Sequence, residues 1–215
     1  GKGLFLIPYF PNKTTITHSM AGLYVHIPFC ASRCIYCGFY STTLGTDARH
    51  DYVSALGKEL TLRRNYLDGL GTLRTIYIGG GTPSQLPCDE IKRLFSHIYN
   101  MCRPNDLKEV TFEANPDDMT PELAYTLREC GVNRVSMGAQ SFDDNRLRFL
   151  HRRHTADEVH RAVETLRGSG MTNLSIDLIY GFPGQTVEEW DKDITCAIGL
   201  DVSHVSAYSL MYDEG

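Results

Sequence analysis

In the stretch LYVHIPFCASRCIYC, residues 23–37, a short apolar run leads directly into three closely spaced cysteines. The run alternates between apolar and polar-tipped side chains, a period of two that is typical of a β-strand. Cys30, Cys34 and Cys37 follow with the spacing CxxxCxxC. The stretch therefore predicts a strand whose C-terminal end opens into a cysteine-bearing loop.

Further along the chain, short apolar runs alternate with helical patterns, two of which begin with capping boxes, at Thr155 with Glu158 and at Thr186 with Glu189. After the strand at 23–27, we expect strands at 75–78, 109–113, 133–137, 173–180 and 202–209, and helices at 51–67 and 89–99 and from Thr120, Thr155 and Thr186. This alternation predicts βαβ units and an α/β fold with a parallel sheet. Six such units form either an open, partial barrel or a doubly wound sheet.

We expect one main domain over residues 20–215, preceded by an extension at residues 1–19 that lies outside the fold. The apolar run in this extension is interrupted by Pro8 and is short for the core of a signal peptide, and no clear small-residue cleavage site follows it. The chain stops soon after the sixth predicted strand, and we expect this end to be a truncation of a longer protein.

The composition of the 215 residues is that of an ordinary soluble globular protein, with 42% hydrophobic and 22% charged residues. This excludes a mostly disordered chain, a coiled coil and a collagen-like fibre. No apolar run approaches the roughly 20 residues that a membrane-spanning helix needs. The formal net charge is −5, so there is no basic surplus of the kind that nucleic-acid binding requires.

Seven cysteines, an odd number, do not form the dense framework of a small disulfide-bonded domain. Three of them are clustered, and the others are scattered at Cys88, Cys102, Cys130 and Cys196. One cluster with scattered single cysteines indicates a reducing compartment, and hence the cytoplasm, together with a metal site.

Three thiolates on one loop can wrap around a small metal centre. A structural zinc ion takes four protein ligands, so a fourth would have to come from His26 or from a distant residue. Iron–sulfur clusters accept thiolates readily, and a four-iron cluster held by three cysteines keeps one iron open for a small molecule. Spacing, loop position and the missing fourth ligand favour the cluster, with zinc or purely structural cysteines as the alternatives.

Polar residues also gather where the other predicted strands end. Gly79-Gly80-Gly81-Thr82 follows the second strand, and consecutive glycines let the backbone approach a ligand closely, although they also suit a simple turn. Glu113 ends the third strand and Gln140 follows the fourth. Asp177 lies within an otherwise apolar strand, where a buried carboxylate must be hydrogen-bonded or paired. These positions share the edge on which barrel enzymes place their sites.

CxxxCxxC after the first strand resembles the radical S-adenosylmethionine (SAM) superfamily, and the segment from Tyr24 to Cys37 resembles its oxygen-independent coproporphyrinogen III oxidase-like branch. The resemblance covers about residues 20–215 and implies a partial (β/α)6 TIM-like barrel with outer helices. It implies a [4Fe–4S] cluster on Cys30, Cys34 and Cys37, whose open iron chelates SAM and whose electron breaks the sulfonium C–S bond. It also implies SAM contacts at Tyr24, Tyr36, Gly80, Gly81, Thr82, Glu113, Gln140, Arg152 and Asp177.

Within that branch, the decarboxylases carry a further cysteine two residues after the third cluster ligand, where this chain has Phe39. This departure favours the haem chaperone relatives (HemW type), which bind haem and deliver it to respiratory haem proteins. The alternative is a coproporphyrinogen III oxidase that decarboxylates propionate side chains, and radical enzyme chemistry stays open.

The resemblance implies haem as cargo, or a porphyrinogen as substrate, and a reductant such as flavodoxin or ferredoxin. It implies contact with membranes only through acceptor proteins, and the net charge of −5 argues against a nucleic-acid partner. The C-terminal domain of the family is not found in this chain.

Overall fold

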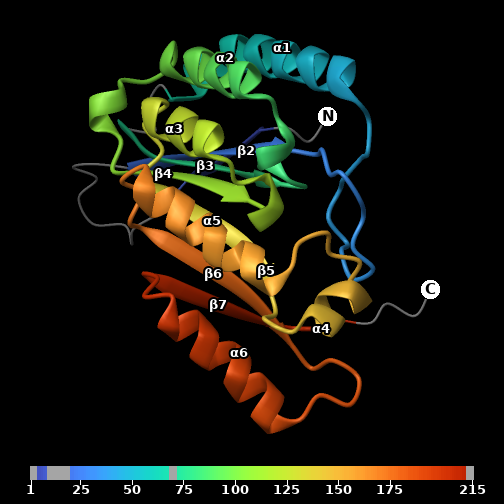
Figure 1. Ribbon diagram of the computed structural model, residues 1–215. Helices are drawn as coiled ribbons and strands as arrows, with labels where there is room; N and C mark the ends of the chain where they lie inside the picture. The colour runs from blue at the N-terminus through green and yellow to red at the C-terminus, as the bar shows by residue number, and fades with distance from the viewer. Residues whose placement is uncertain (1–3, 9–19, 68–71, 212–215) are drawn as a thin grey trace.

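A single sheet runs through the structure, which is a computed structural model that describes residues 4–8, 20–67 and 72–211 (Figure 1). Its strands follow one another across the sheet in the order of the chain. They are β1 (Leu4–Pro8), β2 (Met20–Ile27), β3 (Thr72–Gly80), β4 (Glu109–Ala114), β5 (Arg134–Gln140), β6 (Leu174–Tyr180) and β7 (His204–Ser209).

The strands β2 to β7 are all parallel, each hydrogen-bonded to the next. A doubly wound sheet reverses its strand order at a switch point, and no reversal occurs here. The chain therefore winds in one direction only, as it does in a barrel, and the expected partial barrel of parallel strands with outer helices is confirmed. Parallel strands also bring their C-terminal ends to one edge, where the cysteine loop leaves β2.

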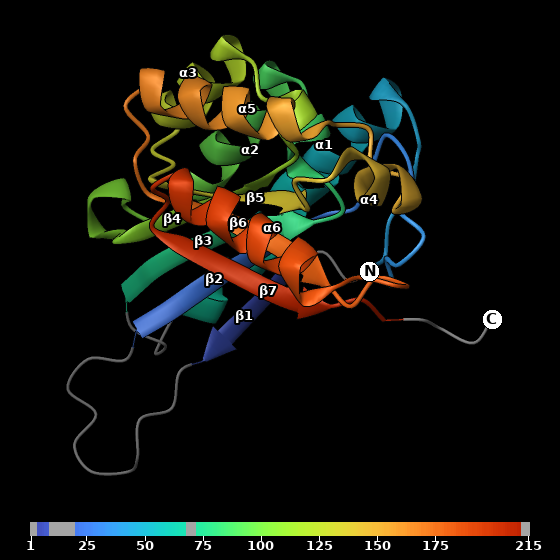
Figure 2. The same cartoon turned by 60° about the horizontal axis from the view of Figure 1, so that its bottom comes forward.

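Helices follow most of the parallel strands. They are α1 (Thr46–Arg63), α2 (Cys88–Tyr99), α3 (Pro121–Glu129), α4 (Asp144–Phe149), α5 (Ala156–Gly168) and α6 (Val187–Gly199), with short 3-10 helices η1 (Arg64–Leu67), η2 (Pro83–Gln85), η3 (Pro104–Asp106) and η4 (Pro116–Asp118). Both predicted capping boxes are present, at the starts of α5 and α6. Figures 1 and 2 show the long helices ranged along the outer side of the sheet, with α6 beside β7.

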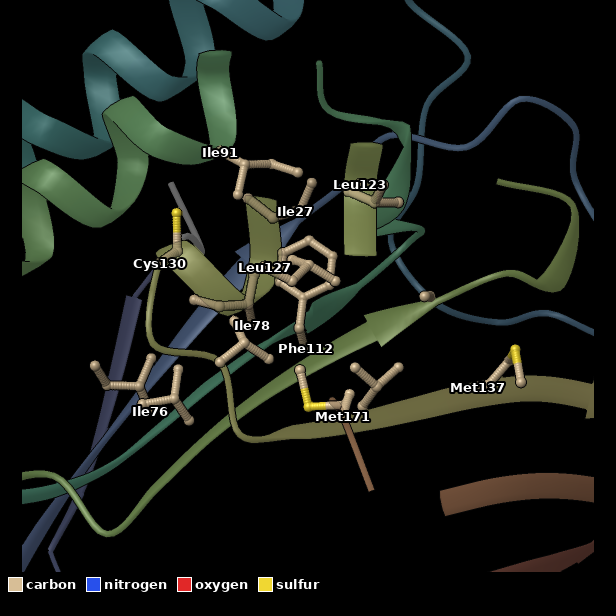
Figure 3. Packing of buried hydrophobic residues seen from close by; sticks show 14 of the residues in the cluster. Ile27, Ile76, Ile78, Ile91, Phe112, Leu123, Leu127, Cys130, Met137 and Met171 are labelled. Atoms are coloured by element: carbon tan, nitrogen blue, oxygen red, sulfur yellow. The ribbon is translucent and has the colours of Figure 1, made fainter. Parts of the chain in front are cut away.

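The main hydrophobic core lies between the sheet and these helices. Alternate residues of strands β2 to β6 face it, such as Ile76 and Ile78 of β3 and Phe112 of β4, and they meet Ile91 of α2 and Leu127 of α3 (Figure 3). The residues between them point to the other face of the sheet, which is largely polar: β3 places Tyr77 there. A polar inner face opposite an apolar outer face leaves the inside of the barrel available for a ligand.

Three elements differ from the expected pattern. Leu4–Pro8 pairs antiparallel with β2, although we expected residues 1–19 to lie outside the fold. The rest of that segment, 1–3 and 9–19, lies outside the described residues. The first helix begins at Thr46, five residues before its expected start at 51, and the short helix α4 was not expected. Helix α4 starts because the Asp143 carboxylate accepts hydrogen bonds from two backbone N–H groups of its first turn.

Candidate functional site

A cavity of about 680 Å³ lies on the inner face of the sheet and reaches its C-terminal edge. Cofactor sites in proteins commonly have volumes of about 300–1,000 Å³. The structure places every predicted site residue except Tyr24 in its lining: Cys30, Cys34, Tyr36, Cys37, Gly80, Gly81, Thr82, Glu113, Gln140, Arg152 and Asp177. Residues from five strands and the loops that follow them therefore surround one space.

The cysteine loop forms one wall of this cavity. Its ends are joined by two backbone hydrogen bonds, from the N–H of Cys30 to Thr42 O (2.9 Å) and from the N–H of Thr42 to Pro28 O (2.7 Å). Cys30 and Cys34 are half-buried and Cys37 is exposed. Burial raises the pKa of the Cys37 thiol, and the two neighbouring thiols act in the same direction.

Across the described part of the chain, no group of three or more His, Cys, Asp or Glu side chains lies close enough together to hold a single metal ion. A cubane cluster sets a different requirement, because each cysteine bonds a different iron and the thiols surround the cluster instead of meeting at one point. Three free thiols on one loop beside a cavity are a donor set that fits such a cluster.

The glycine segment after β3 packs directly against the cysteine loop. The N–H of Gly81 donates to Ile27 O (2.8 Å), and the N–H of Thr82 donates to Phe29 O (2.7 Å). A Cβ on Gly81 would lie 3.0 Å from Cys30 Sγ, so only glycine lets the two segments approach this closely. The Thr82 hydroxyl also donates to Cys30 Sγ at 3.5 Å. The glycines thus bring backbone and cysteine together at one end of the cavity.

Glu113 joins β4 to this glycine segment. Its carboxylate accepts hydrogen bonds from the Tyr77 hydroxyl (2.6 Å) and from the N–H of Gly80 (3.0 Å). Burial raises the pKa of the Glu113 carboxyl, and these two hydrogen bonds oppose the shift. A Cβ on Gly79 would lie 2.9 Å from the carboxylate. The side chain is thereby fixed at the cavity wall with its remaining lone pairs available to a ligand.

Asp177 occupies the same face two strands away. Its carboxylate accepts a hydrogen bond from the Ser136 hydroxyl at 3.3 Å and another from the Ser206 hydroxyl. Burial raises the pKa of the Asp177 carboxyl, and these hydroxyls counteract it. The expectation that a carboxylate in an apolar strand needs hydrogen-bond partners is confirmed. Both carboxylates of the cavity can accept hydrogen bonds from N–H or O–H groups of a bound molecule.

Arg152 brings a cation to the cysteine loop. Its Nη2 atom donates to both Asn115 Oδ1 and Gly138 O, each at 2.7 Å, and its Nη1 atom donates to Cys34 Sγ at 3.5 Å. The Nε atom is buried without a hydrogen-bond partner among the described residues. A guanidinium held in this way, with unused donors beside a cavity, is suited to a carboxylate.

Gln140 ends β5 in an uncommon backbone conformation. Its φ is +71°, and the N–H of Ser141 donates to Ala139 O at 2.9 Å, which together define the rare γ-turn with positive φ at its central residue. The Gln140 Nε2 atom lies over Gly138, where a Cβ would approach it to 2.6 Å. The turn directs the amide of a non-glycine residue into the cavity wall.

The two predicted tyrosines differ in position. Tyr36 lines the cavity, and burial raises the pKa of its hydroxyl above the usual range. Tyr24 stacks on Tyr77, with ring centroids 5.9 Å apart, and its hydroxyl lies 3.2 Å from His26 Nδ1. Burial raises the pKa of Tyr24 to about 12. The structure therefore places Tyr24 behind the cavity lining, next to Tyr77, a lining residue that no sequence motif indicated.

Other lining residues were also missed, among them Asn115, Arg134, Ser136, Ser206 and Tyr208. The signal for Ser136 was available, since it lies on the same strand face as Gly138 and Gln140. Arg134 lies on the same face, but the alternation did not single it out because an arginine at the start of a strand is most often solvated.

The sequence model of the radical SAM superfamily matches residues 24–197, and the chain belongs to this superfamily. The family implies a [4Fe–4S] cluster and SAM as cofactors. The chain is 39% identical over 197 residues to the haem chaperone HemW of Bacillus subtilis (strain 168), covering 90% of this chain and 51% of that protein. It is 37% identical over 189 residues to HemW of Escherichia coli (strain K12), covering 87% and 50%.

Among solved structures, coproporphyrinogen III oxidase (HemN) from Escherichia coli, a radical SAM enzyme, matches with a TM-score of 0.82 and 29% identity, covering 91% of this chain and 45% of that one. SuiB of Streptococcus suis bound to SAM matches with a TM-score of 0.62 and 15% identity, over 92% of this chain and 42% of that one, which shows a shared fold. The chain spans about half the length of the curated relatives it matches.

No helix among the described residues is both long enough and apolar enough to span a membrane.

Proposed function

We propose that this protein is a radical SAM haem chaperone that binds haem and delivers it to respiratory haem proteins. The observation that carries the proposal is Phe39. It lines the mouth of the cavity just after the third clustered cysteine, and 71% of its surface is exposed. An exposed aromatic ring at a cavity rim suits a flat, apolar ligand such as haem. The curated relatives that carry the name haem chaperone support the same assignment.

The cavity residues fit the cofactors of the superfamily. Cys30, Cys34 and Cys37 would hold three irons of the cluster, and the guanidinium of Arg152 would donate to the carboxylate of SAM. When bound, the cluster and SAM supply one-electron chemistry at the sulfonium group.

The remaining predicted contacts would bind the rest of SAM. The carboxylates of Glu113 and Asp177 would accept hydrogen bonds from amino and hydroxyl groups, and the Gln140 amide can both donate and accept. Gly80, Gly81 and Thr82 would bring backbone close to it. Tyr36, within the cysteine loop, would line the cavity next to the bound cofactor. Tyr24 would act through its stacking partner Tyr77, since it does not reach the cavity itself.

In this proposal, the partners are haem as cargo, apo-haem proteins of respiration as acceptors, and flavodoxin or ferredoxin as the reductant. The protein works in the cytoplasm, and it reaches membranes only through its acceptors. The haem chaperone relatives support haem as the cargo, and the seven free cysteines support a reducing compartment.

The second candidate function is oxygen-independent coproporphyrinogen III oxidase activity. The match to HemN, with a TM-score of 0.82, favours it. This reaction removes two propionate carboxylates oxidatively and leaves vinyl groups. The residue at position 39 separates the two functions, because the decarboxylases carry a cysteine there and this chain carries phenylalanine.

Anaerobically reconstituted protein tests both functions in parallel. With haem, we expect stoichiometric uptake and transfer to an apo-oxidase. With coproporphyrinogen III, SAM and reductant, we expect no vinyl-bearing product, and formation of that product would overturn the proposal.

The variant Phe39→Ala should weaken haem uptake. Leu44→Ala is the matched control, because Leu44 is 58% exposed near the end of the same loop and does not line the cavity. Equal effects of the two substitutions would count against a specific contact with Phe39.

A further inference from the structure

The γ-turn at Gln140 is held from two sides by residues that lie far from it in the sequence. Such a turn persists only where its surroundings overdetermine it, and conformations of this kind cluster at ligand sites. Gln140 has one of only three positive φ angles among the non-glycine residues that the structure describes. Its environment therefore shows which groups keep its side chain in place.

The first group is the imidazole of His154, which follows α4. Its Nε2–H donates to Ala139 O at 2.9 Å, the same carbonyl oxygen that closes the γ-turn. The His154 side chain is buried, with only 3% of the residue exposed. Burial lowers the pKa of His154 to about 4, so the ring is neutral and acts as a single donor near pH 7.

The second group is the carboxylate of Asp193 on α6, which is 4% exposed. Its Oδ2 accepts a hydrogen bond from the Ser141 hydroxyl (2.8 Å), and its Oδ1 accepts one from the N–H of Phe142 (2.7 Å). The same Ser141 hydroxyl oxygen accepts from the N–H of Asp143, which caps α4. Asp193 thereby fixes the two residues that leave the γ-turn.

The side chain of Gln140 has no comparable partner of its own. It lines the cavity and is only 9% exposed, yet its amide makes no hydrogen bond with any residue that the structure describes. Buried amides normally have hydrogen-bond partners. The unpaired amide atoms of Gln140 are not themselves buried but are accessible from the cavity, so they are available to a ligand.

We propose that His154 and Asp193 are positioning residues, which hold the residues before and after Gln140 so that its amide is presented to SAM. The inference rests on the proposed SAM site. Asp193 and His154 themselves need not touch SAM, because neither lines the cavity. Their effect on SAM should therefore pass entirely through Gln140.

The test is a double-mutant cycle on the reconstituted protein. The dissociation constant for SAM is measured by anaerobic equilibrium dialysis, and the electron paramagnetic resonance (EPR) signal of the reduced cluster is recorded with and without SAM. Asp193→Ala should raise the dissociation constant about tenfold in the wild-type background. In the Gln140→Ala background, the same substitution should change it by less than about twofold. Asp191→Ala, an exposed aspartate on the same helix, is the control and should change nothing.

Variants of His154 provide an independent test if Asp193→Ala fails to fold. His154→Gln retains a side-chain N–H donor and should keep SAM affinity near the wild-type value, whereas His154→Phe fills the space without a donor and should weaken it. Equal affinities of these two variants, or an additive effect of Asp193→Ala in the Gln140→Ala background, would overturn the inference. Wild-type protein with intact cluster that binds no SAM would instead overturn the proposed function.

Discussion

The Arg152 guanidinium donates a hydrogen bond to Cys34 Sγ at 3.5 Å, across 118 residues of sequence. Arg152 follows α4 in the connection after β5, and Cys34 lies in the loop after β2. The contact places a permanent cation beside a thiol of the predicted cluster. It also connects the two groups that would bind the cluster and the carboxylate of SAM.

Replacing Arg152 by lysine should weaken SAM binding without loss of the cluster. Lysine keeps the charge but cannot reproduce the fixed fork that contacts Asn115, Gly138 and Cys34 together. We expect the dissociation constant for SAM to rise about tenfold or more, measured by equilibrium dialysis. Arg148→Lys, at an exposed position on α4, is the control. Unchanged affinity in Arg152→Lys would remove this residue from the site.

Replacing Gly81 by alanine should disturb the cluster site. The added Cβ would lie 2.9 Å from the carbonyl carbon of Pro28 and 3.0 Å from Cys30 Sγ, so backbone must move. We expect a clear fall in iron and sulfide content after reconstitution. Gly168→Ala is the control, because no atom lies within 4 Å of its added Cβ. That substitution, in α5, should leave the iron content unchanged and stabilise the chain by about 0.5–1 kcal/mol.

The apo chain should lose stability in acid through His154. Because burial lowers the pKa of this histidine from 6.5 to about 4, the unfolded state binds more protons than the folded state between these values. The free energy of unfolding should therefore fall as pH drops through this window, by up to about 3 kcal/mol from this residue. Urea unfolding of wild type and His154→Gln at pH 7 and pH 4.5 measures the difference. The exposed His160→Gln serves as control, and a parallel pH response in wild type and His154→Gln would contradict the expectation.

Substitutions at Gln140 should separate stability from SAM binding. Gln140→Gly relieves the positive φ of 71° and removes the amide, so the apo chain should gain about 1 kcal/mol while SAM affinity falls. Gln140→Ala also lacks the amide but keeps the backbone strain, so it should lose SAM affinity without the gain in stability. Chemical denaturation and equilibrium dialysis measure the two quantities. A gain in stability of the same size in both variants would show that the turn is not strained.

The sequence could predict much of the site because of one rule of topology. Parallel strands bring their C-terminal ends to one edge, so Glu113, Gln140 and Asp177 were expected to meet the cysteine loop, and they line the same cavity. The alternation of side chains over residues 23–27 likewise predicted a strand, and β2 includes them.

Contacts that depend on tertiary packing could not be predicted in this way. Asp193 contacts Ser141 across 52 residues; its spacing from Trp190 and Ala197 places it on the buried face of α6, but the pattern does not reveal its partner. Strand periodicity also cannot predict the positive φ of Gln140 or the position of Tyr24 behind Tyr77. The pairing of Leu4–Pro8 with β2 was missed, because an apolar run containing a proline is a weak strand signal and edge strands tolerate proline.

The most direct test of the central claim is an iron and acid-labile sulfide analysis of the anaerobically reconstituted protein, with single alanine substitutions at the cysteines. A [4Fe–4S] cluster on three thiols predicts about four iron and four sulfide per chain. Replacement of Cys30, Cys34 or Cys37 should abolish both, whereas Cys88→Ala should leave both unchanged. Zinc in place of iron and sulfide, or cluster content that survives all three substitutions, would contradict the account.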